Sequence, residues 1–210
     1  MTDLIIIGTG DHARVALETA RADGRLVRHL VEPSDRAADD SIDGVPVVRG
    51  LARLDEMAPG WEFIVAVGAN RTRAELFARA EAAGGRAAIL VHPTATLLAG
   101  AEVGPGSHVC AGAIVGIEAR IGRNVIVNTA AVLDHDAIIG DHAFLAPRSV
   151  LAGRVTVGSG AHVGLGAVVI EGRTIGAWSL VAAGATVIRD VAPSTRVAGT
   201  PARPMETQDG

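Results

Sequence analysis

From Leu90 onward, aliphatic residues recur at every sixth position of the chain. The second residue of seventeen consecutive hexapeptides is Val, Leu or Ile, in a series that runs from Val91 to Val187. The fifth residue is often small, as at Gly100 and Gly184. A period of six fits neither a helix of 3.6 residues per turn nor the alternation of a long strand. It predicts very short strands joined by tight turns, each strand pointing one aliphatic side chain inward.

Three such strands make one triangular coil of eighteen residues, and stacked coils pair their backbones as parallel strands around an aliphatic column. The crowded corners favour Gly, because some of them require a positive φ. First positions face outward, so His108 and His162 are expected to face solvent. The repeat predicts a parallel β-helix over residues 90–192, followed by a C-terminal tail over residues 193–210.

Residues 1–89 follow a different pattern, in which apolar runs alternate with segments of helical composition. The runs at 4–7, 26–31, 63–67 and 87–91 read as strands, and helices are expected up to residue 20 and over residues 72–83. Strands that alternate with helices predict a small Rossmann-like parallel α/β domain, with a ligand crevice at the carboxyl ends of the strands.

The turn after the first strand matches a dinucleotide-binding fingerprint. It reads Gly8-x-Gly10-x-x-Ala13, and acidic Glu32 follows about twenty residues on. Glycines let a phosphate approach the backbone, and the helix N-terminus attracts its charge. Two alternatives are a tight strand-to-helix turn without a ligand and a site for NAD. The second half offers no substrate domain of the dehydrogenase type, which disfavours NAD.

Composition narrows the class of protein. Of the 210 residues, 49% are hydrophobic and 20% charged, and the net charge is −4. These values exclude a disordered chain and disfavour nucleic acid as a partner. The apolar run at residues 4–7 is too short for a signal or a membrane span, so a cytoplasmic location is expected. The single cysteine, Cys110, has no partner at zinc-site spacing, and we expect no metal and a buried thiol.

His135 is the strongest candidate for proton transfer, because Asp134 and Asp136 flank it. An imidazole accepts protons near neutral pH, and a neighbouring carboxylate raises its basicity and can fix its tautomer. Eighteen residues on, Gly153 lies beside His135 and leaves room for a substrate arm, while Arg154 lies beside Asp136 and is positioned to pair with it. The alternative is an exposed corner histidine without a role.

Two features together resemble one known family. A short α/β half, whose first turn reads Gly-x-Gly-x-His, precedes a full hexapeptide array that carries Asn128-Thr129 and His135-Asp136. The chain resembles the bacterial acetyltransferases that N-acetylate nucleotide-linked 4-amino sugars, and their sialic acid O-acetyltransferase relatives. The resemblance covers essentially the whole chain. It implies left-handed winding of the β-helix, acetyl-CoA as acyl donor, and a homotrimer with its active site between adjacent prisms.

The resemblance also implies roles for individual residues. His135 corresponds to the general base, and Asp136 to the residue that orients it. Substrate-binding positions are Gly10, Asp11, His12, Glu32, Gly68 and Asn128. Positions for acetyl-CoA are Phe144, Gly153, Leu165, Ala183 and Arg203. The chain departs from the family at two positions, where Phe144 replaces a usual histidine and Arg148 a common glycine.

The leading hypothesis is acetyl-CoA-dependent N-acetylation of a nucleotide-linked amino sugar, with direct attack of the amine on the thioester. The second is O-acetylation of sialic acid or another sugar on the same scaffold. The third is a non-catalytic β-helix used for assembly or ligand sensing. The acidic neighbours of His135, together with Gly153, argue against the third.

Overall fold

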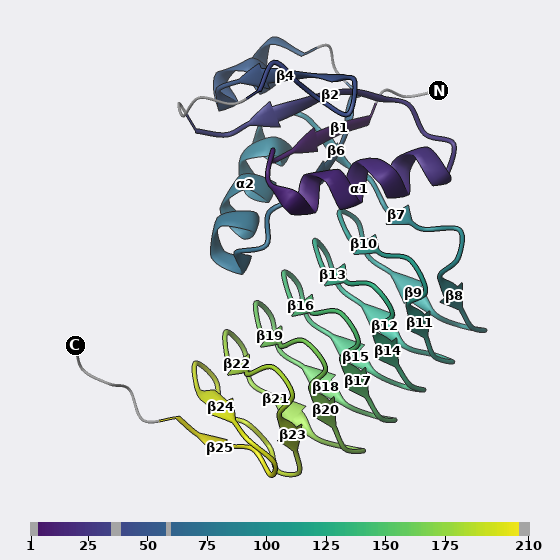
Figure 1. Cartoon of the computed structure of the whole chain (residues 1–210), viewed down its shortest axis with the longest axis vertical. Helices are drawn as coiled ribbons and strands as arrows, with labels where there is room; N and C mark the ends of the chain where they lie inside the picture. Colours follow the sequence, from purple (N-terminus) through teal and green to yellow (C-terminus); the bar gives the residue numbers. More distant parts are fainter. Residues whose placement is uncertain (1–3, 35–38, 58–59, 206–210) are drawn as a thin grey trace.

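The computed structural model describes residues 4–34, 39–57 and 60–205, which form two parts (Figure 1). The N-terminal part is a twisted sheet with helices on both faces. The C-terminal part is a left-handed parallel β-helix, a stack of triangular coils below the sheet in this view. The predicted fold class is therefore confirmed. No helix in the described ranges is long and apolar enough to cross a lipid bilayer.

The N-terminal sheet has the strand order β3-β4-β2-β1-β5-β6, and only the β3–β4 pair is antiparallel. Its strands are β1 (Leu4–Ile7), β2 (Val27–Glu32), β3 (Ser41–Ile42), β4 (Val45–Arg49), β5 (Glu62–Val65) and β6 (Arg86–Ala87). Its helices are α1 (Asp11–Ala22), the 3₁₀ helix η1 (Leu51–Glu56) and α2 (Asn70–Ala82).

Alternation along β1 explains the two helical layers. Leu4 and Ile6 pack with the apolar face of α1, and Ile5 and Ile7 pack with α2 and η1. Successive side chains of a strand point to opposite faces, so a run of four apolar residues requires cover on both sides. The sequence patterns did not reveal β3, β4 and η1. β3 is a two-residue strand at the sheet edge, η1 lies in the connection from β4 to β5, and Pro46 interrupts the apolar run of β4.

The predicted strand over residues 87–91 divides into two. Its first part is β6 of the N-terminal sheet, and its last part, β7 (Leu90–Val91), pairs with the next coil of the β-helix. The hexapeptide register decides this division, because Leu90 lies opposite His108, which is eighteen residues on.

The β-helix has three sheets, and partner strands lie eighteen residues apart along most of each stack. Sheet 1 comprises β7, β10 (His108–Val109), β13 (Ile126–Val127), β16 (Phe144–Leu145), β19 (His162–Val163), β22 (Leu180–Val181), β24 (Arg196–Ala198) and β25 (Arg203–Pro204). Sheet 2 comprises β8 (Thr96–Leu97), β11 (Ile114–Val115), β14 (Val132–Leu133), β17 (Val150–Leu151), β20 (Val168–Val169) and β23 (Thr186–Val187). Sheet 3 comprises β9 (Glu102–Val103), β12 (Arg120–Ile121), β15 (Ile138–Ile139), β18 (Thr156–Val157) and β21 (Thr174–Ile175).

The second-position aliphatic residues from Val109 to Val187 form a continuous buried core. From Gly100 (φ 72°) to Gly184 (φ 67°), the fifth position of every hexapeptide takes a positive φ at the corner. Non-glycine residues adopt it as well, including Asp136 (φ 58°) and Arg154 (φ 59°). The corner conformation therefore belongs to the repeat itself, and Asp136 owes its orientation to it.

The segment predicted as a tail extends sheet 1. β24 adds to β22 in parallel, and β25 folds back antiparallel on β24. Val197 continues the aliphatic column at 5% exposure, which explains why the chain stays on the prism beyond the last hexapeptide.

Sheet 1 packs against the N-terminal domain, and this corrects one expectation. His108 is 1% exposed, and its Nε2 lies 3.0 Å from the Thr19 hydroxyl of α1. His162 is half-buried and stacks on Phe144, with ring centroids 4.7 Å apart. Neither histidine faces open solvent, because the α/β domain covers this one face of the prism. Cys110 is buried as predicted, and burial raises the pKa of its thiol to about 12.

Candidate functional site

The turn between β14 and β15 holds His135 between its two carboxylates. Asp134 Oδ1 accepts a hydrogen bond from the His135 backbone N–H at 2.8 Å. His135 Nδ1 lies 2.8 Å from Asp136 Oδ2. An ionised carboxylate only accepts hydrogen bonds, so this contact places the proton on Nδ1 and leaves Nε2 as a free acceptor. The imidazole is 41% exposed and so accessible to a ligand.

Asp136 also tunes the basicity of His135. Its hydrogen bond is the main cause that raises the pKa of His135 above the ordinary value, and the charge of Asp134 adds to the effect. Arg154 lies one coil on, but its guanidinium pairs with Glu171. The expected pairing of Arg154 with Asp136 is therefore absent, and the Asp136 carboxylate is available to His135.

Gly153 leaves space for the His135 ring. A Cβ atom at Gly153 would lie 2.4 Å from His135 Nε2, far inside van der Waals contact. The coil repeat thus brings together three predicted residues, and the basic nitrogen lies over a backbone that carries no side chain.

A second group of predicted residues lines a cavity of about 280 Å³ at the carboxyl ends of β1, β2 and β5. Five of the six predicted substrate residues lie there: Gly10, Asp11, His12, Glu32 and Gly68. A Cβ atom on Gly10 would meet nothing within 4 Å, so this glycine faces open space. The N-terminus of α1 adjoins the cavity through Asp11, and helix N-termini attract phosphate groups.

Two polar side chains in this cavity are held in defined states. Glu32 is 1% exposed, and its carboxylate accepts hydrogen bonds from the Thr9 hydroxyl and from the backbone N–H and hydroxyl of Ser34. Burial lowers the pKa of His12 to about 4, and the charge of Arg73 acts in the same direction. His12 is therefore neutral at pH 7. Its buried Nε2 has no hydrogen-bond partner among the described residues.

A neighbouring cavity of about 430 Å³ lies between α1 and the corner that joins sheets 1 and 2. Asp11 lines both cavities. Arg14, Glu18 and Asp43 also line this second cavity, and no sequence motif marks them, because two lie at ordinary helical spacing and one lies in a loop. On the prism side, Thr129 lines the cavity and donates its N–H to the side chain of Asn128 at 2.8 Å.

The predicted residues for acetyl-CoA are dispersed within one chain. Leu165, 57% exposed, and Ala183 lie on the corner between sheets 1 and 2, whereas Gly153 lies with His135 on the corner between sheets 2 and 3. Phe144 faces the α/β domain, 6.4 Å from the ring of His12. Arg203 lies in β25 and lines a third cavity of about 340 Å³.

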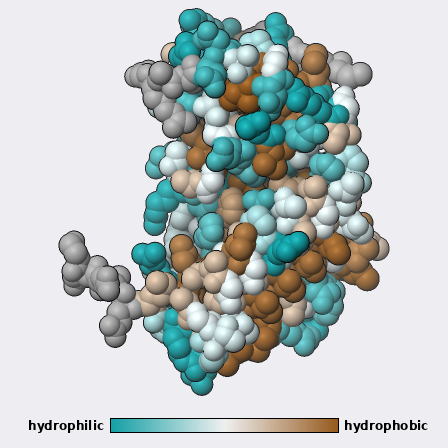
Figure 2. Space-filling model, viewed as in Figure 1, coloured by the Kyte–Doolittle hydropathy of each residue, from teal (hydrophilic) through white to brown (hydrophobic). Residues whose placement is uncertain are grey.

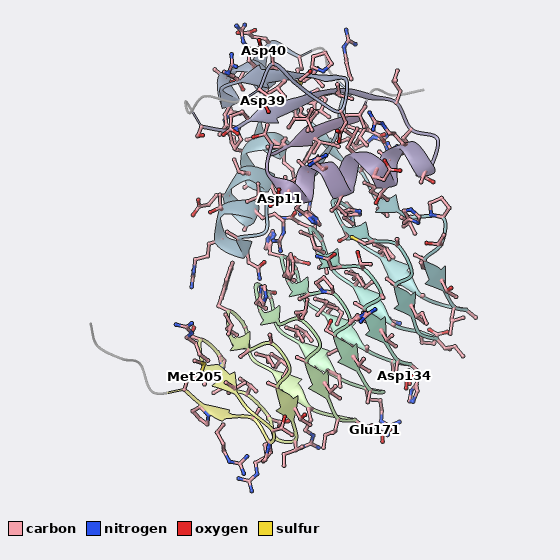
Figure 3. The ribbon with its side chains drawn as sticks, in the orientation of Figure 1. Asp11, Asp39, Asp40, Asp134, Glu171 and Met205 are labelled. Carbon is pink, nitrogen blue, oxygen red and sulfur yellow. The ribbon has the colours of Figure 1, made fainter. Side chains whose placement is uncertain are left out.

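One chain therefore does not unite the predicted site. Figure 3 shows Asp11 where the two domains meet and Asp134 on the outer edge of the prism. His135 follows Asp134 on the corner between sheets 2 and 3, while Asn128 occupies the corner between sheets 1 and 2. Over residues 4–34, 39–57 and 60–205, no group of three or more His, Cys, Asp or Glu side chains is arranged to hold a metal ion.

Comparisons with known proteins show which family and which solved structures this chain resembles. Residues 3–80 match the family described as the PglD N-terminal domain. The chain is 39% identical to PerB from Caulobacter crescentus, solved in complex with CoA and GDP-perosamine, with a TM-score of 0.91 over 98% of both chains. It is 35% identical to the acetyltransferase domain of PglB from Neisseria gonorrhoeae, solved in complex with acetyl coenzyme A, with a TM-score of 0.90 over 97% of this chain and 98% of that one.

A third similar structure is a variant of the Caulobacter crescentus perosamine N-acetyltransferase in which one histidine is replaced by asparagine. It also contains CoA and GDP-perosamine, and it is 37% identical, with a TM-score of 0.91 over 98% of both chains. None of the curated proteins searched matches this chain.

Proposed function

Because the chain belongs to the family of hexapeptide-repeat sugar N-acetyltransferases, we propose that it transfers the acetyl group of acetyl-CoA to the amine of a nucleotide-linked amino sugar. The observation that carries the proposal is the corner at His135. A histidine hydrogen-bonded to Asp136 points its free Nε2 over Gly153, a position without a side chain.

The chemistry follows from the acceptor. A sugar amine is mostly protonated at pH 7 and becomes nucleophilic only after it loses a proton. Neutral His135 accepts that proton at Nε2, while Asp136 stabilises the imidazolium that forms. The amine nitrogen then attacks the thioester carbonyl carbon, and the C–S bond breaks. The CoA thiolate leaves and takes a proton from the imidazolium. The new amide nitrogen gives up its remaining extra proton to the imidazole so freed, which passes it to water. The thioester is already activated, so no covalent enzyme intermediate is required.

The two cavities suit the acceptor. The turn at Gly10 and the N-terminus of α1 can receive a diphosphate, and Glu32 lies at the end of β2 beside it. The larger cavity continues from Asp11 to Thr129, next to Asn128. A nucleotide in the first cavity would therefore extend its sugar toward the prism corner that carries Asn128.

A second copy of the chain completes the site in this proposal. The outward first positions of sheet 2 are largely aliphatic, with Ile114, Val150 and Val168 each 37–39% exposed. In Figure 2, hydrophobic residues gather along the lower right of the β-helix, where Figure 1 labels β11, β14, β17 and β20. Sheet 3 presents mainly polar residues at the equivalent positions, namely Glu102, Arg120, Thr156 and Thr174, with Ile138 as the exception.

The position of this apolar sheet explains the dispersed site. Sheet 2 lies between the corner that carries His135 and the corner that carries Asn128, Leu165 and Ala183. If three copies pack their sheets 2 around a threefold axis, the His135 corner of one copy lies against the Asn128 corner of the next. His135 and Asn128 lie in the same coil, residues 126–143, so the two would meet at one height. We propose a homotrimer with three shared sites.

Val150→Glu tests this assembly. A charge at the centre of a face that the trimer buries is costly, so we expect light scattering to shift from a trimer to a monomer and activity to fall roughly tenfold or more. The matched control is Ile138→Glu on sheet 3, where Ile138 is 51% exposed. It should leave both mass and activity unchanged. A wild-type monomer at micromolar concentration would overturn the shared-site proposal.

Asp136→Asn tests the tuning of the base. The hydrogen bond to Asp136 raises the pKa of His135, so its loss lowers that pKa. Activity that requires neutral His135 rises with pH through this pKa, and the acid limb of the rate profile should move to lower pH. Turnover should fall less than on loss of His135 itself. Asp134→Asn, which keeps an acceptor for the backbone N–H, should shift the limb less. An unmoved limb in Asp136→Asn would contradict this role.

A further inference from the structure

Arg73 is a fully buried cation in the junction between the two domains. It is 0% exposed and lies on the face of α2 that also buries Leu76, Phe77 and Ala80. The spacing 73, 76, 77 and 80 is that of one helical face, which is the one sequence signal that predicts a buried arginine here.

All five N–H groups of this guanidinium have a carbonyl acceptor. Nε donates to Asn124 O at 3.2 Å, Nη1 to Val67 O at 3.0 Å and Gly68 O at 3.3 Å, and Nη2 to His142 O at 2.6 Å and Ala143 O at 3.1 Å. A guanidinium offers five donors in a planar fork, so the site uses its whole capacity. Burial lowers the pKa of Arg73 to about 9, which keeps it charged at neutral pH.

The five acceptors come from both domains. Val67 and Gly68 follow β5 and line the cavity that holds the predicted nucleotide residues. Asn124, His142 and Ala143 lie on the corner between sheets 3 and 1, in two successive coils. One side chain therefore joins the wall of the nucleotide cavity to the prism.

The first turn of α2 extends this contact along the prism. Asn70 Nδ2 donates to Gly160 O at 3.0 Å and Ala161 O at 3.2 Å, and the Arg71 guanidinium lies 4.5 Å from the ring centre of Trp178. The contacted positions 124, 142, 160 and 178 are eighteen residues apart, so they form one column on four coils. Hydrogen bonds are directional, so bonds along this column fix the position of α2 along the long axis of the β-helix. Apolar packing alone would not fix that position.

We propose that Arg73 is a positioning residue that fixes the height of the nucleotide cavity along the β-helix, so that the acceptor amine arrives level with the acetyl-transfer corner. This proposal takes the identity of the acceptor, a nucleotide-linked amino sugar, from the proposed function. A displacement of about 1 Å in an acceptor can cost about 100-fold in rate, so alignment by Arg73 would be visible in kinetics.

The test compares Arg73→Met and Arg73→Lys with Arg79→Met. Arg79 also lies on α2, but it pairs with Asp55 and has no bond to the prism among the described residues. In Arg73→Met we expect the acceptor KM to rise at least about tenfold and kcat to fall, with the acetyl-CoA KM within about twofold. Arg73→Lys keeps the charge and some of the donors, and it should recover part of the loss. Arg79→Met should match the wild type.

A second measurement does not depend on activity. The chain has two tryptophans, so Trp61→Phe leaves Trp178 as a single fluorophore at the junction. In this background, Arg73→Met should increase acrylamide quenching of Trp178, Arg73→Lys should do so less, and Arg79→Met should not. If Arg73→Met does not fold, Arg73→Lys carries both measurements.

The outcomes separate the two proposals. A lower melting temperature with unchanged acceptor KM and unchanged quenching would reduce Arg73 to a stabilising residue and overturn the alignment role. If the wild-type protein acetylates no nucleotide-linked amine, the proposed function fails, and the Trp178 measurement alone decides whether Arg73 holds the junction.

Discussion

Replacing His135 with alanine should lower kcat for acetyl transfer about 10²–10⁴-fold, the usual contribution of a general base. The imidazole is the group at this corner whose basicity suits a sugar amine, and its ring packs directly over Gly153, where a Cβ atom would collide with Nε2. The side chain is partly exposed and makes no core contact, so the fold, the oligomer and CoA binding should persist. Stopped assays of CoA release with acetyl-CoA and an amino sugar nucleotide measure the loss.

Gly153→Ala provides an independent test of the same geometry. Its Cβ would collide with the imidazole, so His135 must move and turnover should fall. The double variant His135→Ala, Gly153→Ala should be no slower than His135→Ala alone, because residues that act through one contact are not additive. A loss of less than about threefold in His135→Ala would place the base elsewhere. Additive losses in the double variant would give Gly153 a separate role.

A nucleotide-linked amino sugar should be acetylated at least about 100-fold better in kcat/KM than the same sugar without its nucleotide, a difference of about 2.7 kcal/mol in transition-state binding. The cavity at Gly10, Asp11 and Gly68 belongs to the α/β domain, so a free sugar would make none of its contacts. Binding energy from a remote part of a substrate can hold the reacting amine in place.

Gly10→Val locates this effect in the cavity. A side chain at Gly10 meets no protein atom within 4 Å, and its φ of −80° is allowed for other residues, so the variant should fold. The added methyl groups would occupy the space proposed for the diphosphate. We expect the acceptor KM to rise while the acetyl-CoA KM stays within about twofold.

Two results would overturn the acceptor assignment. Equal rates on the free and the nucleotide-linked sugar would show that the α/β domain does not bind the acceptor. A clear preference for sialic acid would favour O-acetylation on the same scaffold, the second hypothesis from the sequence. Parallel assays distinguish these cases, with GDP- and UDP-linked 4-amino sugars, the free sugars and sialic acid as acceptors.

Much of the candidate site could be predicted because the repeat converts sequence distance into spatial distance. Gly153 lies beside His135 because strands pair eighteen residues apart, and the same rule places Arg154 near Asp136. The rule gives backbone position but not side-chain pairing. It therefore did not reveal that Arg154 pairs with Glu171, which comes from the next coil.

The sequence by itself determined the two folds and the composition of the candidate site at His135, because a hexapeptide coil and a strand–turn–helix unit each depend on residues that are near in sequence or at a fixed period. Only the tertiary structure decided which faces of the prism are covered. The α/β domain packs on sheet 1, so it buries His108, places His12 near Phe144 and directs Nε and Nη2 of Arg73 to carbonyls of the prism. Sheet 2 remains apolar and open. Packing between units has no period along the chain, since it depends on the shapes and hydrogen-bonding groups that two folded surfaces bring together.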